Sequence, residues 1–455
     1  MSDLRTGCIH RPVRRFSVQG GVAAALLAVA APFTFPVPAS GAAVTAEPGR
    51  GGQGIADFYA ARRGFPLWFA NGQPSEAASL LIETLAQSDV DGLDPRKYRL
   101  QELQRAMRAA GWGGNGRAAR QADMLLSQAL VAYVRDLRRA GDIGVVYVDS
   151  DLRPGPPSPR AILDAAARAP SLTFYVRDLG WMNPAYGQLR NALLTRSYSS
   201  ETERRALALS LERARELPAG PKRHVLVNAA AQRLEMVENG RVVGAMNVVV
   251  GKPKNPTPMM AAYIRFAALN PYWNVPPDLA AERIAPNVNK MGLHYLKAYG
   301  YEVLSDWGDN PTIVDPSTID WKAVEAGTTE IRVRQLPGKA NSMGQMKFMF
   351  PNAEGVYLHD TPDKQLLSEA SRLFSGGCVR LEDAPRLAEW LFGKPISAAG
   401  AGTEEAAPLP TPVPVYITYL TAVPTGSSIA YFDDIYGRDT ARMAQLNGSF
   451  LAGSR

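Results

Sequence analysis

The chain has 455 residues, which is too many for one average domain and predicts two or three. With 46% apolar residues it can bury sizeable cores, and its 35 prolines and 40 glycines predict many turns and linkers. The formal net charge of +7 is spread along the chain, so we expect no nucleic-acid partner. A mild positive balance suits an anionic envelope polymer, but an ordinary solvated surface is the simpler explanation.

Residues 1–42 have the pattern of a signal peptide. A basic segment that contains Arg14 and Arg15 precedes an apolar run at 20–35 and a zone of small residues suited to cleavage. The run is short for a membrane span, so membrane attachment is expected only through an uncleaved signal, if at all. Cleavage would remove four arginines and one aspartate and leave a charge of +4. The arginine pair also hints at twin-arginine export, but ordinary secretion is the preferred hypothesis.

A mostly helical domain is predicted at 49–216. Apolar residues recur at spacings of three and four, which predicts amphipathic helices within 55–63, 75–88 and 125–137. Two or three more helices are expected after a proline-rich linker at 141–159. We find no carboxylate pair or metal-ligand spacing in this region, so we interpret it as structural.

From His224 onward the hydrophobic pattern alternates, which predicts a β-rich domain at 223–440. Glu238-Asn239-Gly240-Arg241 is a strong hairpin turn between two of its strands. We interpret His224 itself as a surface or edge residue at the start of a strand.

Residues 276–332 interrupt the β pattern with helical and loop stretches. An insertion of this length in a β domain is typically a functional lid, and we expect it to cover a cleft rather than to fold as a separate domain. His294, within it, is interpreted as structural. Farther on, residues 397–412 are predicted to be a loop, and 413–422 and 429–432 a closing β pair.

The chemistry-bearing residues lie between these strands. The chain has two cysteines, and Cys8 falls in the predicted signal peptide, so the exported protein would keep Cys378 as an odd thiol. An odd cysteine indicates intermolecular pairing or a reactive thiol. His359 ends an apolar strand-like run and precedes a turn, so a strand would deliver its side chain to a cleft. On spacing alone, however, a lone cysteine and histidine are more often core residues than a pair.

The residues around Cys378 favour the reactive thiol. An unperturbed thiol has a pKa of about 8.5, so it needs a base or a cation nearby to attack at neutral pH. Gly376 and Gly377 let the backbone approach a substrate and direct N–H groups at a developing oxyanion. Arg380 supplies a fixed positive charge for the thiolate or for a substrate carboxylate.

Two stretches together resemble a known catalytic signature. Tyr357-Leu358-His359-Asp360-Thr361-Pro362, followed by Ser375-Gly376-Gly377-Cys378-Val379-Arg380, resembles the signature of L,D-transpeptidases, especially the large branch typified by YcbB. Gly376 stands where many members of the family have a histidine. In the helical region, the FY…PLW pattern of residues 58–68 and the DGLDP pattern at 91–95 resemble the scaffold domain of that branch. The Leu-Gln and Phe-Gln patterns of its small wall-binding module are not found.

The resemblance implies an α+β protein: a helical N-terminal scaffold domain followed by a β-rich L,D-transpeptidase catalytic domain with an inserted helical lid. It implies a periplasmic enzyme that needs no cofactor or metal and acts on peptidoglycan stem peptides, with penicillin-binding proteins as candidate partners. Cys378 would attack the bond between meso-diaminopimelate and D-Ala, and His359 would be its base. An amine of a second stem would then complete a cross-link between third residues.

Other residues receive roles from the same reasoning. The backbone N–H groups of Gly377 and Cys378 are expected to be oxyanion donors, with the Tyr357 hydroxyl as an addition, and the Asp360 carbonyl is expected to orient the imidazole. Substrate contacts are expected from Arg380, Ser375, Gly376, Trp273 and Asn274. If His359 forms an ion pair with the thiol, thiolate should exist well below a pH of about 8.5.

Three kinds of alternative stay open at this point, the first of which differs only in the acceptor of the thioester. Water in place of the amine would give an L,D-carboxypeptidase, and a free D-amino acid would give exchange. A generic cysteine peptidase and a non-catalytic wall-binding protein are further alternatives, against which the family signature and the Cys/His pair argue.

Overall fold

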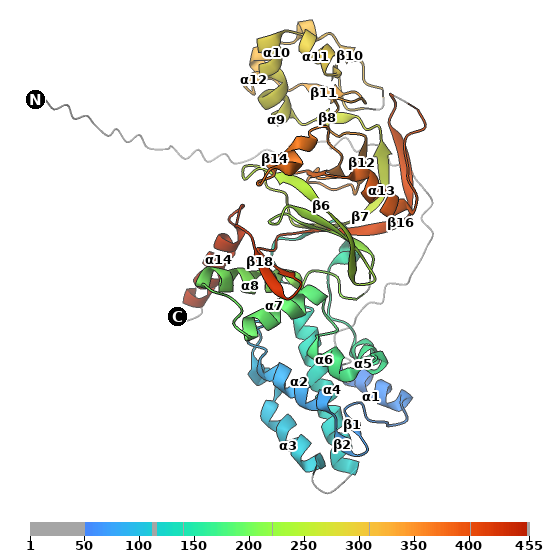
Figure 1. Cartoon of the computed structure of the whole chain (residues 1–455), viewed down its shortest axis with the longest axis vertical. Coiled ribbons are helices and arrows are strands. Elements are labelled where there is room, and N and C mark those ends of the chain that lie inside the picture. Colours follow the sequence, from blue (N-terminus) through green and yellow to red (C-terminus); the bar gives the residue numbers. More distant parts are fainter. Residues whose placement is uncertain are drawn as a thin grey trace, which may run out of the picture.

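The computed structural model describes residues 51–111, 116–139, 141–220, 222–308, 310–400 and 402–452. The predicted signal peptide, residues 1–42 with Cys8, lies outside the described residues. Three bodies follow one another along the long axis: a helical domain, a β-barrel and a smaller α/β subdomain at the far end (Figure 1). The predicted α+β fold, helical first and β-rich second, is confirmed.

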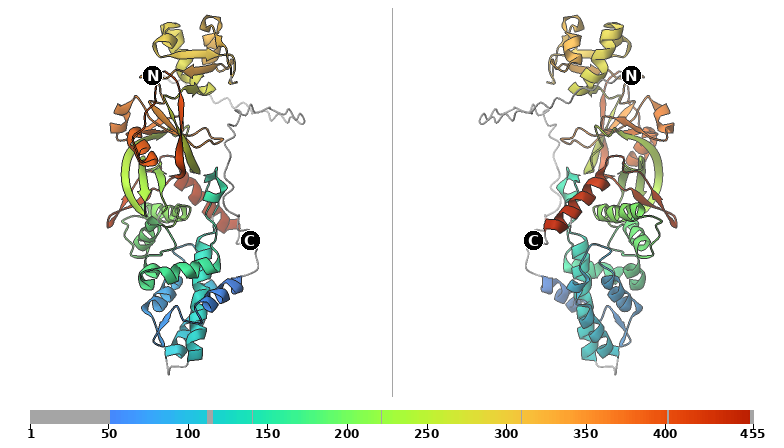
Figure 2. Two further views of the ribbon diagram at one scale, coloured as in Figure 1. Left: turned by 90° about the vertical axis from the view of Figure 1, so that its right-hand side faces the viewer. Right: turned by 90° about the vertical axis from the view of Figure 1, so that its left-hand side faces the viewer.

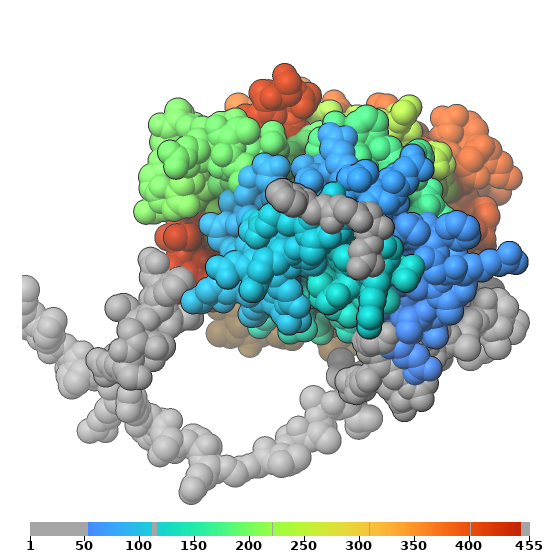
Figure 3. All heavy atoms as spheres, turned by 90° about the horizontal axis from the view of Figure 1, so that it is seen from below, coloured from blue at the N-terminus to red at the C-terminus, as the bar shows by residue number. Residues whose placement is uncertain are grey.

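The helical domain is built from segments whose apolar faces meet in one core. Seen from below (Figure 3), the first segments of this domain, coloured blue to cyan, make up much of that end of the molecule. Its helices are α1 (Gly51–Ala61), α2 (Glu76–Ala86), α3 (Leu100–Gly111), α4 (Gly116–Leu137), α5 (Pro159–Arg168), α6 (Leu172–Arg177), α7 (Pro184–Leu194) and α8 (Glu201–Ala214). Shorter elements are β1 (Phe69–Ala70), β2 (Gln73–Pro74), η1 (Pro95–Tyr98) and η2 (Ser150–Leu152).

The helix starts follow directly from the sequence. The side chains of Ser158, Ser171, Asn183 and Ser200 each accept a hydrogen bond from the backbone N–H three residues on, at the starts of α5 to α8. Proline occupies the first position of α5 and α7, where its missing N–H costs nothing.

The FY…PLW pattern is explained by one aspartate on α4. Asp123 is buried and accepts hydrogen bonds from the backbone N–H groups of Leu67, at 3.0 Å, and Trp68, at 2.6 Å, and from the Tyr59 hydroxyl. Ser127, one turn later, accepts from the Trp68 indole at 2.9 Å. These bonds fix the segment after α1 against the middle of the domain.

The DGLDP pattern supplies a second buried carboxylate. Asp91 accepts hydrogen bonds from the hydroxyls of Tyr133 on α4 and Tyr186 on α7, both at 2.7 Å. It also accepts from the Arg190 guanidinium at 3.0 Å, and both charged side chains are almost completely buried. The loop after α2 is thereby joined to two helices that are distant in sequence.

The β-rich body is a closed β-barrel. Its sheet has the order β12-β13-β15-β6-β5-β4-β16-β7-β3, and β12 also pairs with β7, which closes the ring. The strands are β3 (Val146–Tyr147), β4 (His224–Asn228), β5 (Arg233–Glu238), β6 (Arg241–Gly251), β7 (Met260–Leu269), β12 (Met346–Met349), β13 (Leu358–His359), β14 (Leu373–Ser375), β15 (Val379–Leu381) and β16 (Glu405–Thr418). Helix α13 (Ala384–Phe392) and the turn η5 (Lys364–Ser368) accompany them. The expected hairpin turn is present, with positive φ at Asn239 and Gly240.

Two expectations for the C-terminal part are wrong. Residues 405–412 are strand rather than loop. Residues 405–408 pair with β7, and the register shift between Pro408 and Val413 absorbs prolines that cannot donate to a ladder. Residues 413–418 pair with β7 and β4, not with 429–432. The closing hairpin is instead β17 (Ala422–Thr425) with β18 (Ser428–Tyr431).

The two large domains are interlocked. Strand β3, which follows α4, joins the barrel beside β7, while the β17–β18 hairpin packs on the scaffold core through Ala422. Arg213 of α8 is buried and bonds to the Tyr419 carbonyl at 3.0 Å and to Asp439 at the start of α14 (Arg438–Ala452). Figure 2 shows α14, in dark red, beside the junction. The predicted boundary between 216 and 223 therefore does not separate two independent bodies.

The insertion is more than a helical lid. It has its own four-stranded antiparallel sheet, in the order β10-β9-β11-β8, and its own apolar core. The strands are β8 (Trp273–Val275), β9 (Tyr301–Leu304), β10 (Ile313–Val314) and β11 (Arg332–Gln335), and the helical elements are α9 (Pro277–Leu279), η3 (Ala280–Ile284), α10 (Ala285–Met291), α11 (His294–Ala298), η4 (Pro316–Thr318) and α12 (Trp321–Glu325). We call residues 273–335 the lid subdomain. Because β8 and β11 pair with each other, the insertion folds around its own core, contrary to expectation.

We expect Asp91→Ala to destabilise the scaffold domain strongly. The substitution leaves the buried Arg190 guanidinium without its carboxylate, which costs about 3–5 kcal/mol. Urea unfolding should show this loss, whereas Asp178→Ala, which removes the exposed partner of Arg177, should unfold like the unaltered protein. Equal midpoints for the two variants would contradict this account of the motif.

Candidate active site

The register of three short strands brings the predicted residues onto one face of the barrel. His359 of β13 pairs with Arg380 of β15 in parallel and with Lys347 of β12 in antiparallel fashion. Paired residues lie on the same face, and residues two apart on a strand do so as well. Cys378, two positions before Arg380, therefore shares this face with His359.

Asp360 orients the imidazole of His359. The Asp360 carbonyl lies 2.6 Å from Nδ1, and since a carbonyl only accepts, the hydrogen of the neutral ring is on Nδ1 and Nε2 is free to accept a proton. The Asp360 carboxylate is held by the Gln345 backbone N–H at 2.9 Å and by Lys364 at 2.7 Å. A side chain at Gly344, where φ is +64°, would collide with this carboxylate, so glycine is required there.

The loop before Cys378 is fixed by hydroxyl groups. The Ser375 hydroxyl donates to the Cys378 carbonyl at 2.5 Å and accepts from the Gly377 N–H at 3.1 Å. The Thr257 hydroxyl donates to the Gly377 carbonyl at 2.8 Å and accepts from the Gly251 N–H at 2.9 Å. Gly377 has a φ of +123°, which disfavours any other residue.

These bonds change the expectation for the oxyanion donors. The Gly377 N–H already donates to Ser375, so it is not free to stabilise an oxyanion in this structure. The backbone N–H of Cys378 has no acceptor in the described part of the chain and remains the candidate. Ser375 is 2% exposed, which favours a structural role over the predicted substrate contact.

The electrostatics favour an uncharged pair. Burial, followed by the Arg380 guanidinium, lowers the pKa of His359 to about 3, while the Asp360 carbonyl opposes this. Burial raises the pKa of the Cys378 thiol above its ordinary range, against a backbone hydrogen bond from Tyr357 and the charges of Lys347 and Arg380. In this structure the thiol donates a hydrogen bond to the Gly355 carbonyl at 3.6 Å. A neutral thiol and a neutral imidazole are therefore the resting state, and the thiolate–imidazolium ion pair considered above is not favoured.

Two cations accompany the sulfur. Arg380 is paired with Asp363 at 3.4 Å, and burial lowers its pKa. The Lys347 ammonium lies 3.8 Å from the centroid of the Tyr357 ring, and burial lowers its pKa also. Tyr357 thus contacts Cys378 through its backbone and Lys347 through its ring face.

The lid subdomain reaches this site through α9 and η3. Leu279 lies beside Gly376, where an added Cβ would be 3.7 Å from its methyl group. Glu282 forms an ion pair with Lys254. The charge of Arg283 contributes to lowering the pKa of Arg380. The insertion therefore borders the catalytic loop, as a lid would.

The remaining predicted residues lie elsewhere. Trp273 is 7% exposed in the lid core, beneath the Arg283 guanidinium at 5.7 Å, so its indole is mostly enclosed there. Asn274 is exposed on β8 opposite Arg334, and no described contact joins it to Cys378. His224 is buried at the start of β4, a central strand, so its interpretation as a surface or edge residue is wrong. His294 is exposed at the start of α11.

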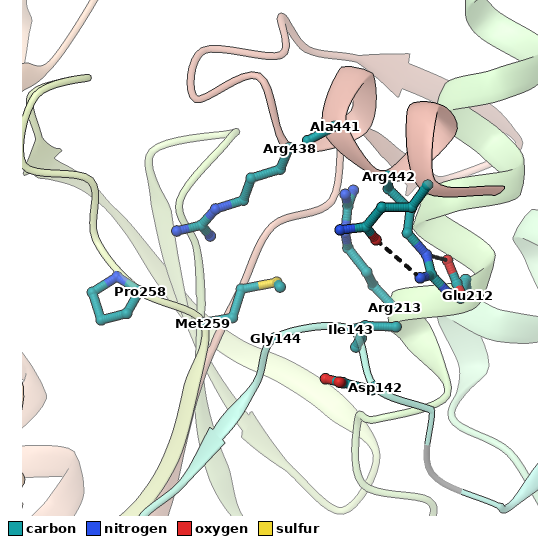
Figure 4. A pocket seen from close by; sticks show the side chains of 11 residues that line it. Asp142, Ile143, Gly144, Glu212, Arg213, Pro258, Met259, Arg438, Ala441 and Arg442 are labelled. Atoms are coloured by element: carbon teal, nitrogen blue, oxygen red, sulfur yellow. Dashed lines mark hydrogen bonds and ion pairs between the residues drawn. The ribbon is translucent and has the colours of Figure 1, made fainter. Parts of the chain in front are cut away.

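A pocket of about 370 Å³ lies at the domain junction rather than at Cys378 (Figure 4). Arg213 and Glu212 of α8 face Arg438 and Arg442 of α14 across it, and Glu212 is paired with Arg442. Arg438 also donates to the Thr257 carbonyl at 2.8 Å. We interpret the pocket as part of the junction that supports the catalytic loop.

Two searches over the described residues were negative. No group of three or more His, Cys, Asp or Glu side chains is arranged to hold a metal ion. None of the described helices is long and apolar enough to span a membrane.

Comparison with known families identifies the domains. Residues 53–193 match the scaffold domain, and residues 222–415 match the L,D-transpeptidase catalytic domain, named YkuD. This chain combines a scaffold domain with an L,D-transpeptidase catalytic domain. The predicted resemblance is thereby confirmed.

One relative and two solved structures are similar. A Haemophilus influenzae protein named "Putative L,D-transpeptidase" is 27% identical over 409 residues, which are 86% of this chain and 80% of that protein. An L,D-transpeptidase from Mycobacterium smegmatis is 15% identical, with 44% of this chain and 59% of that chain covered and a TM-score of 0.21. The catalytic domain of the Enterococcus faecium L,D-transpeptidase is 15% identical, with 43% and 97% covered and a TM-score of 0.19. Such low TM-scores carry no argument about the fold.

Three residues of the L,D-transpeptidase domain escaped the sequence reasoning. Lys347 was visible only as a polar position in an alternating strand, and its proximity to Cys378 depends on the order of strands. Thr257, fully buried between two prolines, resembled an ordinary turn residue. Arg283 belongs to the lid subdomain, and no local sequence pattern predicts where that subdomain lies relative to Cys378.

The pKa directions predict how Cys378 of this L,D-transpeptidase domain reacts with iodoacetamide. Since the thiol pKa is raised, thiolate should appear only at a pH above the ordinary range of a free thiol, and the alkylation rate should rise there in one step. His359 stays neutral above a pH of about 3, so no plateau of reactivity is expected near pH 6. A plateau at pH 6 that is lost in His359→Ala and kept in His294→Ala would contradict the neutral pair.

Proposed function

We propose that the protein is a periplasmic peptidoglycan L,D-transpeptidase that uses Cys378 as nucleophile and His359 as general base. The observation that carries the proposal is the pairing of β13 with β15, which supports a shared face for the two side chains while Asp360 leaves Nε2 of His359 free. The substrate class follows from the family of the catalytic domain: the peptide stems of peptidoglycan.

The first half-reaction forms a thioester. As the sulfur of Cys378 attacks the carbonyl between meso-diaminopimelate and D-Ala, Nε2 of His359 takes the thiol proton. The Cys378 N–H is the donor that we assign to the resulting oxyanion. When the carbon–nitrogen bond breaks, His359 returns the proton to the nitrogen of the departing D-Ala.

The second half-reaction forms the cross-link. A neutral amine on a second stem attacks the thioester carbonyl, and His359 takes a proton from that nitrogen. The carbon–sulfur bond breaks, the sulfur recovers the proton, and the two stems are joined through their third residues. Water in place of the amine would make the protein an L,D-carboxypeptidase, and a free D-amino acid would give exchange; the three acceptors share every step up to the thioester.

Cys378→Ser should abolish turnover, because a serine hydroxyl is a far weaker acid and nucleophile than a cysteine thiol in the same position. Incubation with purified tetrapeptide muropeptides, followed by intact-mass analysis, should detect an acyl-enzyme and cross-linked product for the unaltered protein only. A carbapenem should likewise add covalently to the unaltered protein and not to the variant. His359→Ala should retain the fold and lose roughly two to four orders of magnitude in acylation rate. Undiminished cross-linking by the serine variant would refute the proposal.

The lid subdomain should govern the reaction with stems but not the reactivity of the thiol. Its two ends are close, since the side chain of Asn341 donates to the Pro271 carbonyl at 2.9 Å, so a short glycine linker can replace residues 273–335. The deletion should leave Cys378 open to iodoacetamide, because the thiol belongs to the barrel, and should slow acylation by tetrapeptide stems. Unchanged acylation kinetics in the deletion variant would mean that the subdomain takes no part in substrate binding.

A further inference from the structure

We propose that Lys347 is a positioning residue whose ammonium group lies near Cys378 and stabilises the sulfur as it becomes negative. The inference rests on the proposed function, since it assigns a role within the same acyl transfer. It adds a residue to the site that neither the catalytic signature nor the chemistry of a cysteine–histidine pair requires.

The position of Lys347 follows from strand register. It lies opposite His359 on the antiparallel β12–β13 pair, and the flanking Met346 and Phe348 point to the barrel core. Lys347 therefore projects to the outer face, which it shares with His359 and Cys378. An outward lysine on a barrel is usually solvated, whereas this one is partly buried against the Tyr357 ring.

Tyr357 holds the ammonium in place. The ring centroid is 3.8 Å from Nζ, well within the range of a cation–π contact. No carboxylate lies within ion-pair distance of Lys347 among the described residues, although Glu404 acts on it from farther away. Arg380, in contrast, forms an ion pair with Asp363, which partly neutralises its charge. Lys347 is thus the cation whose charge is least neutralised near the sulfur.

The electrostatic couplings agree with this geometry. Lys347 and Cys378 act on each other, and Lys347 also disfavours an imidazolium at His359. A cation in this position stabilises the thiolate of Cys378 and destabilises the imidazolium of His359. It therefore favours loss of the thiol proton and also favours transfer of that proton from His359 to the leaving group. The charged and titratable groups around the pair are Lys347 of β12, Tyr357 and His359 with Asp360 at β13, Asp363 and Lys364 after it, Arg380 of β15, Glu404 before β16 and Arg283 of the lid.

The test compares the pH dependence of Cys378 alkylation by iodoacetamide in the full-length protein. Lys347→Met removes the charge and keeps the aliphatic length, so the midpoint should move upward by about one pH unit. Lys347→Arg restores a cation and should return the midpoint most of the way. Lys297→Met, at an exposed position on α11, is the matched control and should leave the midpoint unchanged.

Muropeptide acylation separates the outcomes. If Lys347 acts on the sulfur, Lys347→Met lowers the acylation rate by about tenfold at neutral pH and leaves KM unchanged. A raised KM with an unaltered alkylation midpoint would overturn the proposal, because it would make Lys347 a substrate contact. Equal melting temperatures of the methionine and arginine variants exclude misfolding as the cause of a shift. An unshifted midpoint with normal acylation refutes the inference alone, whereas a shifted midpoint in a protein that never acylates refutes the proposed function alone.

Discussion

The parallel pairing of β13 with β15 is the constraint on which the catalytic site depends. Side chains alternate along a strand, so a slip of one residue would turn His359 into the core and Leu358 toward the lid. Strands this short cannot hold a register by themselves. Closure of the barrel through β7 and β12 fixes their neighbours, and Lys364 ties the Asp360 carboxylate to the carbonyls of Leu381 and Glu382 after β15.

The same face combines burial with positive charge, and the two effects oppose each other at the sulfur. Burial favours the neutral thiol, while Lys347 and Arg380 favour the thiolate. At His359 both effects act in one direction, against the imidazolium. At rest the proton therefore stays on the sulfur. Lys347 and Arg380 lower the free energy needed to remove it as the sulfur attacks a carbonyl. Such an arrangement protects a lone thiol from adventitious alkylation and oxidation.

Much of this architecture could be predicted from local patterns. Periodicity gave α1, α2 and α4, the Asn239-Gly240 turn gave the β5–β6 hairpin, and the two signature segments gave Cys378 and His359. What failed depended on long-range pairing. The prolines at 408–412 indicated a loop, yet one edge of that segment is free, so strand geometry is tolerated there.

The same limit applies to the site itself. The aromatic, proline-bounded segment at Trp273 indicated a cleft, but its indole is used in a core that only the folded insertion creates. Lys347 and Thr257 became visible only when strands and loops far apart in sequence were placed side by side. The prediction of a helical insertion missed β8 and β11 for the same reason. Each strand is only a few residues long, and the two pair with each other across most of the insertion.

The interlocked domains also set an order for folding. Ala422 completes the core that α7 and α8 begin, and Tyr431 donates to the Ser197 carbonyl across 234 positions of sequence. A chain synthesised from its N-terminus exposes the apolar sides of these two helices until the barrel and the lid subdomain have both emerged. The entropy of closing so long a loop grows only slowly with its length, so the delay costs time more than stability. An emerging chain that ends before residue 422 therefore exposes an apolar helical surface to which a chaperone can bind. The β17–β18 hairpin covers this surface later.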